Sequence, residues 1–273
     1  MTPLYAGIGG VVRELTEMHT GINGVVMPLT EMWARVSGVE RQIFSAVTEK
    51  QAGEYAVGDV VNLEDTSGQL IEYLVVNQGL PDSSLYDSSC DGTWLLRRGL
   101  GDESAFGSTN AFSRSTLLSY LKNTVYNSFS QKVKNAIKTV KIPYTATAGS
   151  NTVSSGANGL SCNCFVLSCA ELGFRPEDSD SHRIFVNDGA KLAYFEYGKT
   201  SSAKNKRLAL NQAAQRGYYH TRSQEGTETT RGVLSIGYTG SAAYGTSLNK
   251  SNVREAVVLN KNTVFDGNTN TIL

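Results

Sequence analysis

The first 46 residues repeat one 14-residue pattern of apolar and polar positions. Residues 5–18 and 19–32 are close copies, and residues 33–46 form a more divergent third copy. Each copy carries a turn dipeptide between apolar, mostly β-branched residues, first Gly-Gly, then Asn-Gly, then Ser-Gly. Gly-Gly and Asn-Gly are typical of two-residue hairpin turns, and Ser-Gly is a weaker signal. The pattern therefore predicts three short β-hairpins in series.

One short hairpin buries too little apolar surface to be stable alone. We therefore expect residues 1–46 to be an assembly or attachment segment, separate from a domain over residues 47–273. An N-terminal β-meander of that domain is the alternative interpretation. The positions that align between copies, and that we expect to mediate assembly, are Ile8, Gly10, Ile22, Gly24, Val36 and Gly38.

The remainder of the chain alternates between strand patterns and one helical region. Apolar alternation predicts a hairpin over residues 54–77, a short strand over 93–98 and a buried strand over 164–168. Residues 145–161 are polar and rich in Ser, Thr, Gly and Asn, so they are expected to form an exposed loop.

Leucines at helical spacing predict an amphipathic helix that begins near Ser113 and includes Leu117, Leu118 and Leu121. A second apolar stripe continues the helical pattern to Val140, and proline at position 143 is expected to end it.

Composition and charge exclude some partners. The chain has 25 basic and 25 acidic residues and no charged run, so nucleic acid is not a favoured partner. Charged residues make up 18% of the chain, below the usual value of about 25%, so its polar surface depends on Ser, Thr, Asn, Gln, Gly and Tyr. No secretion signal and no apolar run of about 20 residues is present, so we expect cytoplasmic synthesis and no membrane insertion.

Catalytic motifs are missing from the sequence. It contains no Gly-x-Ser-x-Gly, no His-Glu-x-x-His and no phosphate-binding loop, so we expect a protein that is not an enzyme and uses no cofactor. A pair of distant carboxylates that cleaves glycosides is the enzymatic alternative. The acidic segment over residues 177–180 is expected to be a solvated turn rather than a calcium loop.

Three of the four cysteines, Cys162, Cys164 and Cys169, lie close together in an apolar segment. Their spacing and the scattered histidines do not fit a structural zinc site, so no metal is expected. We expect buried free thiols that pack as small hydrophobic groups. A disulfide from Cys90 into this cluster remains an open alternative.

Several short motifs occur in the order found in a bacterial and phage module, the DUF6273 type. They are Thr93-Trp-Leu-Leu-Arg-Arg, then Ser-x-Leu-Leu-x-Tyr-Leu-x-Asn from Ser115, and Cys164-Phe-Val-Leu-Ser-Cys-Ala-Glu-Leu-Gly. The chain resembles this family over about residues 54–265. It departs from the family pattern in the aromatic signature near residue 218 and at Gln224 and Glu255, where the family usually has proline.

The resemblance implies an α+β fold similar to C-type-lectin or formylglycine-enzyme-like proteins. Such a fold has a mixed or antiparallel sheet, one or two helices and termini that pair in the sheet, and its long loops form a binding face. The N-terminal repeat, in turn, resembles segments at the start of tail-associated proteins of phages and prophages of Gram-positive bacteria.

A candidate ligand site follows from the Tyr, Ser, Gly and Asn composition of residues 238–249, which is typical of adaptable binding loops. An ordinary surface hairpin loop is the alternative. We expect aromatic stacking and hydrogen bonding to a ligand by Tyr218, Tyr219, His220, Arg222, Tyr238, Tyr244 and Asn249.

These features together favour a structural and binding protein of a phage tail, located in the virion. We expect it to form a homo-oligomer, to contact other tail proteins through residues 1–46 and to bind a glycan or protein on the host surface. A purely architectural virion or baseplate subunit is the first alternative. A bacterial surface adhesin domain is the second.

Overall fold

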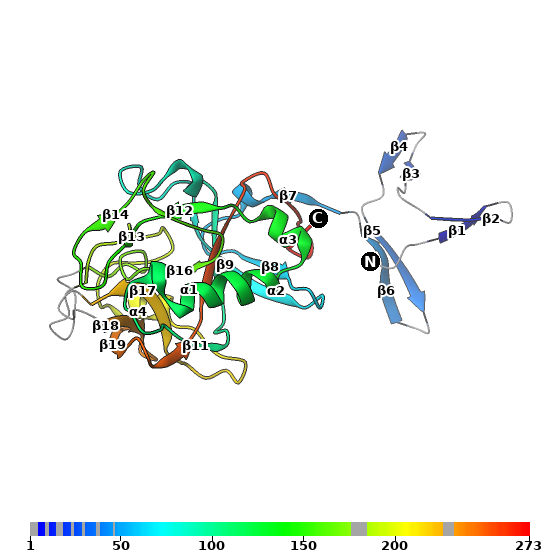
Figure 1. The fold of residues 1–273 in the computed structure, drawn as a ribbon. Coiled ribbons are helices and arrows are strands. Elements are labelled where there is room, and N and C mark those ends of the chain that lie inside the picture. The colour runs from blue at the N-terminus through cyan, green and yellow to red at the C-terminus, as the bar shows by residue number, and fades with distance from the viewer. Residues whose placement is uncertain are drawn as a thin grey trace. The chain divides into compact units, whose positions relative to one another are not determined.

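The computed structural model describes residues 47–175, 185–225 and 232–273, and the backbone of six strands within the first 45 residues. The chain divides into two compact units, Met1–Thr48 and Glu49–Leu273 (Figure 1). The first contains three antiparallel strand pairs, as the repeat predicts; its turn glycines Gly10, Gly24 and Gly38 lie outside the described residues. The pairs are β1 (Tyr5–Ile8) with β2 (Val11–Glu14), β3 (His19–Ile22) with β4 (Val25–Pro28), and β5 (Glu31–Val36) with β6 (Val39–Ser45).

The second unit is a mixed α+β structure in which strands predominate. Its larger sheet has eight strands in the order β16-β21-β10-β9-β8-β23-β22-β7. The predicted hairpin over residues 54–77 is present as the antiparallel pair β8 and β9. The strands are β7 (Glu49–Gln51), β8 (Val60–Glu64), β9 (Leu70–Gln78), β10 (Thr93–Arg97), β16 (Phe165–Val166), β21 (Glu255–Leu259), β22 (Val264–Asp266) and β23 (Thr271–Ile272).

The two ends of this unit meet in the larger sheet. β22 pairs antiparallel with β7, and β23 lies parallel to β8. One side of the sheet therefore pairs segments that are about 200 residues apart in the sequence, and the ends of this unit pair in the sheet as the resemblance implies.

A smaller sheet positions the candidate site. It has five strands in the order β11-β20-β17-β18-β19, and β17 in its centre is buried at every position. Its members are β11 (Glu103–Ala105), β17 (Tyr219–Gln224), β18 (Gly232–Ile236), β19 (Ala242–Thr246) and β20 (Lys250–Asn252). Two further antiparallel pairs are β12 (Val140–Ile142) with β15 (Leu160–Cys162), and β13 (Tyr144–Thr145) with β14 (Val153–Ser154).

The predicted helix is present, with different limits. Ser115 caps its start by accepting a hydrogen bond from the amide of Leu118 at 3.0 Å. Leu117, Leu118 and Leu121 face the core. The helical segments are α1 (Thr116–Tyr120), a π-helical stretch (Leu121–Val125), α2 (Tyr126–Ser128), α3 (Gln131–Ala136), α4 (Ser201–Arg207) and the 3₁₀ turns Ala52–Glu54, Ser88–Cys90 and Phe112–Arg114. No helix in these described stretches is long and apolar enough to cross a membrane.

Two expectations for residues 137–161 are wrong. Helix α3 ends at Ala136, ahead of Pro143, because the amide of Lys138 donates instead to the carbonyl of Val258 at 2.8 Å. The segment expected as an exposed loop contains β14 and the start of β15. In the first case the hydrogen-bond partner is distant in the sequence, whereas β14 and β15 pair with the nearby strands β13 and β12. In both cases these partners override the local pattern.

The core packs around Trp94 in β10. Its indole ring makes edge-on contacts with Tyr86 and Phe165, each at 5.6 Å between ring centroids. All four cysteines are buried free thiols, so the alternative of a disulfide from Cys90 is wrong. The prediction of small, hydrophobic, buried thiols is confirmed.

Candidate functional site

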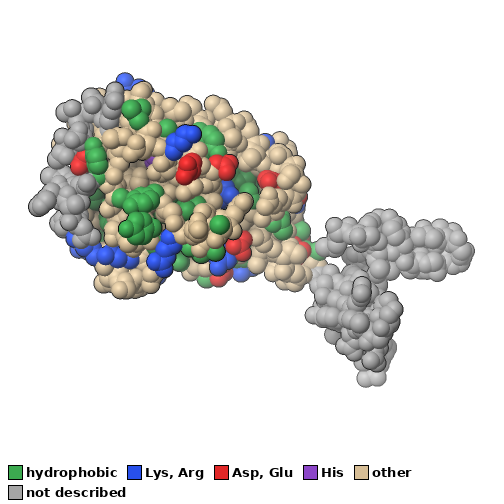
Figure 2. Space-filling view, turned by 90° about the horizontal axis from the view of Figure 1, so that it is seen from below, with side chains coloured by type: hydrophobic (Ala, Val, Ile, Leu, Met, Phe, Trp, Pro, Cys, Tyr) green, Lys and Arg blue, Asp and Glu red, His purple; other side chains and the backbone are tan. Residues whose placement is uncertain are grey.

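Four of the seven residues predicted to bind a ligand line one pocket of about 550 Å³. The pocket lies over the five-stranded sheet and takes residues from β11, β17, β18, β19 and β20. Figure 2 views the second unit from the side of β11, β18 and β19, and it shows a patch of hydrophobic side chains on this face. The four predicted residues are Tyr218, His220, Tyr244 and Asn249.

The tyrosines of this face are exposed. Tyr218 and Tyr238 pack edge to face, with ring centroids 5.7 Å apart, while 44% and 55% of their surfaces remain accessible. Tyr244, which lines the pocket, is 38% exposed. These aromatic rings remain accessible although two of them contact each other. Such rings can pack against a ligand over a large area and lose little side-chain entropy on binding. We call Tyr218, Tyr238 and Tyr244 the tyrosine face.

The loop that carries Tyr238 is held close to α4. Gly240 has a φ of 77°, and a Cβ atom at this position would collide with the backbone of Lys204 in α4. Glycine satisfies both the positive φ and the close approach. The turn between β18 and β19 is therefore anchored, and this anchoring restricts where Tyr238 can lie.

The polar lining of the pocket is close to neutral in charge. It contains one carboxylate, Glu103, and one ammonium, Lys250, together with hydroxyl and amide groups. Burial lowers the pKa of His220, so its imidazole is neutral at neutral pH. Its Nε2 lies 2.7 Å from the carbonyl of Ser104 and must donate there, because a carbonyl oxygen only accepts. The pocket thus suits an uncharged polar ligand.

Tyr219 and Arg222 were predicted in the binding face, and the structure places both in the core, each 2% exposed. The hydroxyl of Tyr219 donates to the carbonyl of Arg207 at 2.7 Å. Arg222 forms a buried ion pair with Glu171. These contacts hold both side chains in the core, neither lines the pocket, and these two assignments are wrong.

Sequence reasoning missed the other polar groups of the pocket. Lys250 and Asn252 directly follow the predicted loop, so a longer window could have included them. Glu103 and Ser235 come from β11 and β18, and only the strand order brings them to β17 and β20. No local signal in the sequence identifies these two residues.

The structure tests the other predicted sites only in part. Ile8, Ile22 and Val36 each end the first strand of a pair, and the structure says nothing of their side chains. The acidic segment 177–180 lies outside the described residues. Among the residues that the structure does describe, no group of three or more His, Cys, Asp or Glu side chains could hold a metal ion.

Comparison with known proteins gives one result. Residues 91–261 match DUF6273, a domain of unknown function. No curated protein and no solved structure gives a significant match. The matched region spans β10 to β21 and includes the strands that form the pocket and the tyrosine face. Because the match covers more than half of the chain, the protein belongs to the DUF6273 family.

Proposed function

We propose that this chain is a tail-associated protein of a phage or phage-like particle that binds the host surface through the tyrosine face. The observation that carries the binding part is the exposed Tyr218–Tyr238 pair beside a pocket of nearly neutral charge. Aromatic rings next to hydroxyl and amide groups fit the apolar and polar faces of a sugar ring. An uncharged surface glycan is therefore the favoured ligand. The tail assignment depends on the N-terminal repeat and on its resemblance to phage tail segments.

The binding proposal can be tested with the purified full chain on a microarray of bacterial surface glycans. We expect signal on a subset of neutral glycans and its loss in the double variant Tyr218→Ala, Tyr244→Ala. Tyr197→Ala is the matched control, because Tyr197 is 47% exposed and does not line the pocket. Equal binding by the double variant and the control would contradict the assignment of this face.

A purely architectural subunit is the second candidate, and the three strand pairs of residues 5–45 favour an assembly role for that segment. Light scattering on the full chain and on a chain that starts at residue 47 tests it. The shorter chain keeps β7, which pairs with β22. A defined oligomer that becomes a folded monomer on truncation would support assembly through the repeats. An architectural role alone predicts this result together with no glycan signal.

A further inference from the structure

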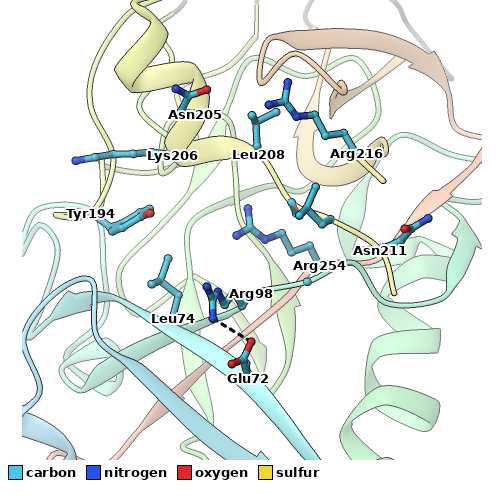
Figure 3. Close-up of a pocket in the computed structure, with 13 residues that line it drawn as sticks. Glu72, Leu74, Arg98, Tyr194, Asn205, Lys206, Leu208, Asn211, Arg216 and Arg254 are labelled. Atoms are coloured by element: carbon cyan, nitrogen blue, oxygen red, sulfur yellow. Dashed lines mark hydrogen bonds and ion pairs between the residues drawn. The ribbon is translucent and has the colours of Figure 1, made fainter. Parts of the chain in front are cut away.

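A second pocket, of about 610 Å³, lies beside the end of the larger sheet. It is formed mainly by β9, the turn after β10, α4 with the segment that follows it, and the junction of β20 and β21 (Figure 3). It shares Asn211 with the pocket of the tyrosine face and no other lining residue. The two pockets can therefore be altered independently by mutation.

This pocket is rich in positive charge. Four cationic side chains line it, Arg98, Lys206, Arg216 and Arg254, with a single carboxylate, Glu72. Since the whole chain carries equal numbers of basic and acidic residues, this local excess is a property of the fold rather than of the composition. A hollow lined by one sign of charge attracts ligands of the opposite sign.

The existing ion pairs leave part of this charge uncompensated. Arg98 is bound to Glu72 at 3.1 Å, and Lys206 is bound to Glu196 at 2.9 Å. Both pairs are partly exposed and therefore weak. Arg216 is exposed, and within the described parts of the chain its side chain makes no ion pair.

Arg254, which is buried in the wall of this pocket, is the residue on which the inference depends most. Its side chain is 3% exposed, and it is held by hydrogen bonds from Nε to the carbonyl of Arg97 at 2.8 Å and from Nη1 to that of Arg207 at 3.3 Å. Its other described partners are the hydroxyl of Tyr219 at 3.3 Å and the ring of the same tyrosine, with 5.2 Å between Cζ and the ring centroid. All of these partners are neutral, so no carboxylate in the described residues balances its charge. Figure 3 shows its guanidinium directed into the space between Tyr194 and Leu208.

A buried cation without a counter-charge is unfavourable, and an anion in the pocket would remove this cost. Nε and Nη1 of Arg254 are already engaged, so Arg254 can offer Nη2 to an anion. The exposed guanidinium of Arg216 can present two parallel donors, which match a carboxylate or a phosphate group. The volume exceeds what a bare ion needs and lies in the range of pockets for small organic ligands. Leu74, Leu208 and the ring of Tyr194 can contact the apolar body of such a ligand.

We infer that this pocket binds a small organic anion through a carboxylate or phosphate group that Arg254 and Arg216 hold. This site is distinct from the tyrosine face and extends the proposed function to a second ligand class. Arg254 supplies a buried guanidinium in the wall of the pocket, and Arg216 supplies an exposed one. The leucines and Tyr194 accommodate the remainder of the molecule.

Calorimetric titration of the full chain with glucuronate, glucose 6-phosphate and glucose tests the inference. These probes share a sugar ring and differ in charged group. We expect at least one of the two anions to bind, and glucose to bind at least about tenfold more weakly, since hydrogen bonds between charged groups contribute roughly 1.5–3 kcal/mol. Binding by one anion and not the other identifies whether carboxylate or phosphate is preferred. Absence of binding by both anions, or equal binding by glucose, would overturn the inference.

Charge-removing variants assign the site. We expect Arg216→Gln to weaken anion binding about tenfold or more, because it removes a charged donor from an exposed position without disturbing the core. Lys132→Gln in α3 is the matched control, since Lys132 is an exposed cation away from the pocket. The double variant of Tyr218 and Tyr244 should retain anion binding. If Arg216→Gln binds the anion as tightly as Lys132→Gln does, the anion binds elsewhere and the assignment fails.

Discussion

Arg222 and Glu171 form a fully buried, two-bond ion pair, with Nη1–Oε2 and Nη2–Oε1 distances of 2.5 and 2.6 Å. The pair joins β17 of the smaller sheet to the segment that follows β16 of the larger sheet. Tyr86 adds a hydrogen bond from its hydroxyl to Glu171 at 2.7 Å, and the carbonyls of Val166 and Asp188 accept from Arg222. This network fixes the sheet that carries the tyrosine face to the main core.

Removing one partner of this pair is expected to be strongly destabilising. Arg222→Met leaves the carboxylate of Glu171 buried without a counter-charge, which costs about 3–5 kcal/mol of unfolding free energy. Urea denaturation measures this cost. The double variant Arg222→Met, Glu171→Gln should recover part of the loss, because it removes the isolated charge. No recovery in the double variant would show that Arg222 acts by packing alone.

Asp188 is expected to make stability depend on pH. Burial raises the pKa of its carboxyl group to about 6, although Arg222 and Ser223 act in the opposite direction. This pKa is higher in the folded state than in the unfolded chain, where it is about 4. The protonated carboxyl group of Asp188 therefore contributes its full stabilisation below about pH 4, and this contribution is lost as the pH rises through about 6. Ionisation of Asp188 at pH 8 therefore lowers the free energy of unfolding by about 3 kcal/mol relative to the protein with Asp188 protonated.

The variant Asp188→Asn isolates this effect, since an amide cannot ionise. Its unfolding free energy relative to the unmodified chain should increase between pH 5 and pH 8. Ser223 can still donate to the side-chain oxygen at position 188, as it does to Asp188 at 2.8 Å. Urea denaturation at both pH values measures the difference. The same pH dependence in both proteins would show that Asp188 is not the group responsible.

Adjacent tyrosines are expected to respond differently to mutation. Tyr219→Ala removes a buried ring and a hydroxyl that contacts Arg207, and we expect a loss of about 3–5 kcal/mol in unfolding free energy. Tyr218→Ala removes an exposed ring and should change stability by less than about 1 kcal/mol. Thermal unfolding of both variants tests this contrast. Similar losses in the two variants would contradict the assigned burial.

The thiols are expected to be unreactive in the folded protein. Burial raises the pKa of Cys90 to about 11 and the pKa values of Cys162 and Cys169 to about 12, and it also raises that of Cys164. The thiolate is the reactive form, so little is available near pH 8. A colorimetric thiol reagent should detect no thiol in the native chain and all four after denaturation. Fast labelling of the native protein would contradict this packing.

Much of the local structure could be predicted because the signals are short-range. Turn dipeptides indicated the strand pairs of the N-terminal repeat, and alternation indicated the hairpin of β8 and β9. The helical stripe of Leu117, Leu118 and Leu121 has the spacing that places these residues on one face. The limits of α3 could not be predicted, because Val258, which receives the amide of Lys138, is far away in the sequence.

The candidate site was predictable only in part. The composition of residues 238–249 identified Tyr238 and Tyr244, and the departure from the family's aromatic signature identified Tyr218. All three are exposed in the structure. The same departure from the family pattern also suggested Tyr219 and Arg222. The sequence does not show that they are buried, because alternation along a strand assigns faces only when one face is solvated. β17 is buried at every position, and of its predicted ligand-binding residues only His220 lines the pocket.

The sequence by itself determined the short-range elements, the family and the tyrosine-rich segment, since these depend on neighbouring residues. The tertiary structure alone decided which polar side chains are buried and which charges meet. Arg254 follows a short strand in the sequence and gives no sign of a binding role. It becomes a candidate anion-binding residue because the fold buries its guanidinium among neutral groups at the wall of a cationic pocket. Burial and charge pairing depend on strand order, and strand order joins residues that are more than 100 positions apart, as in the pairing of β10 with β21.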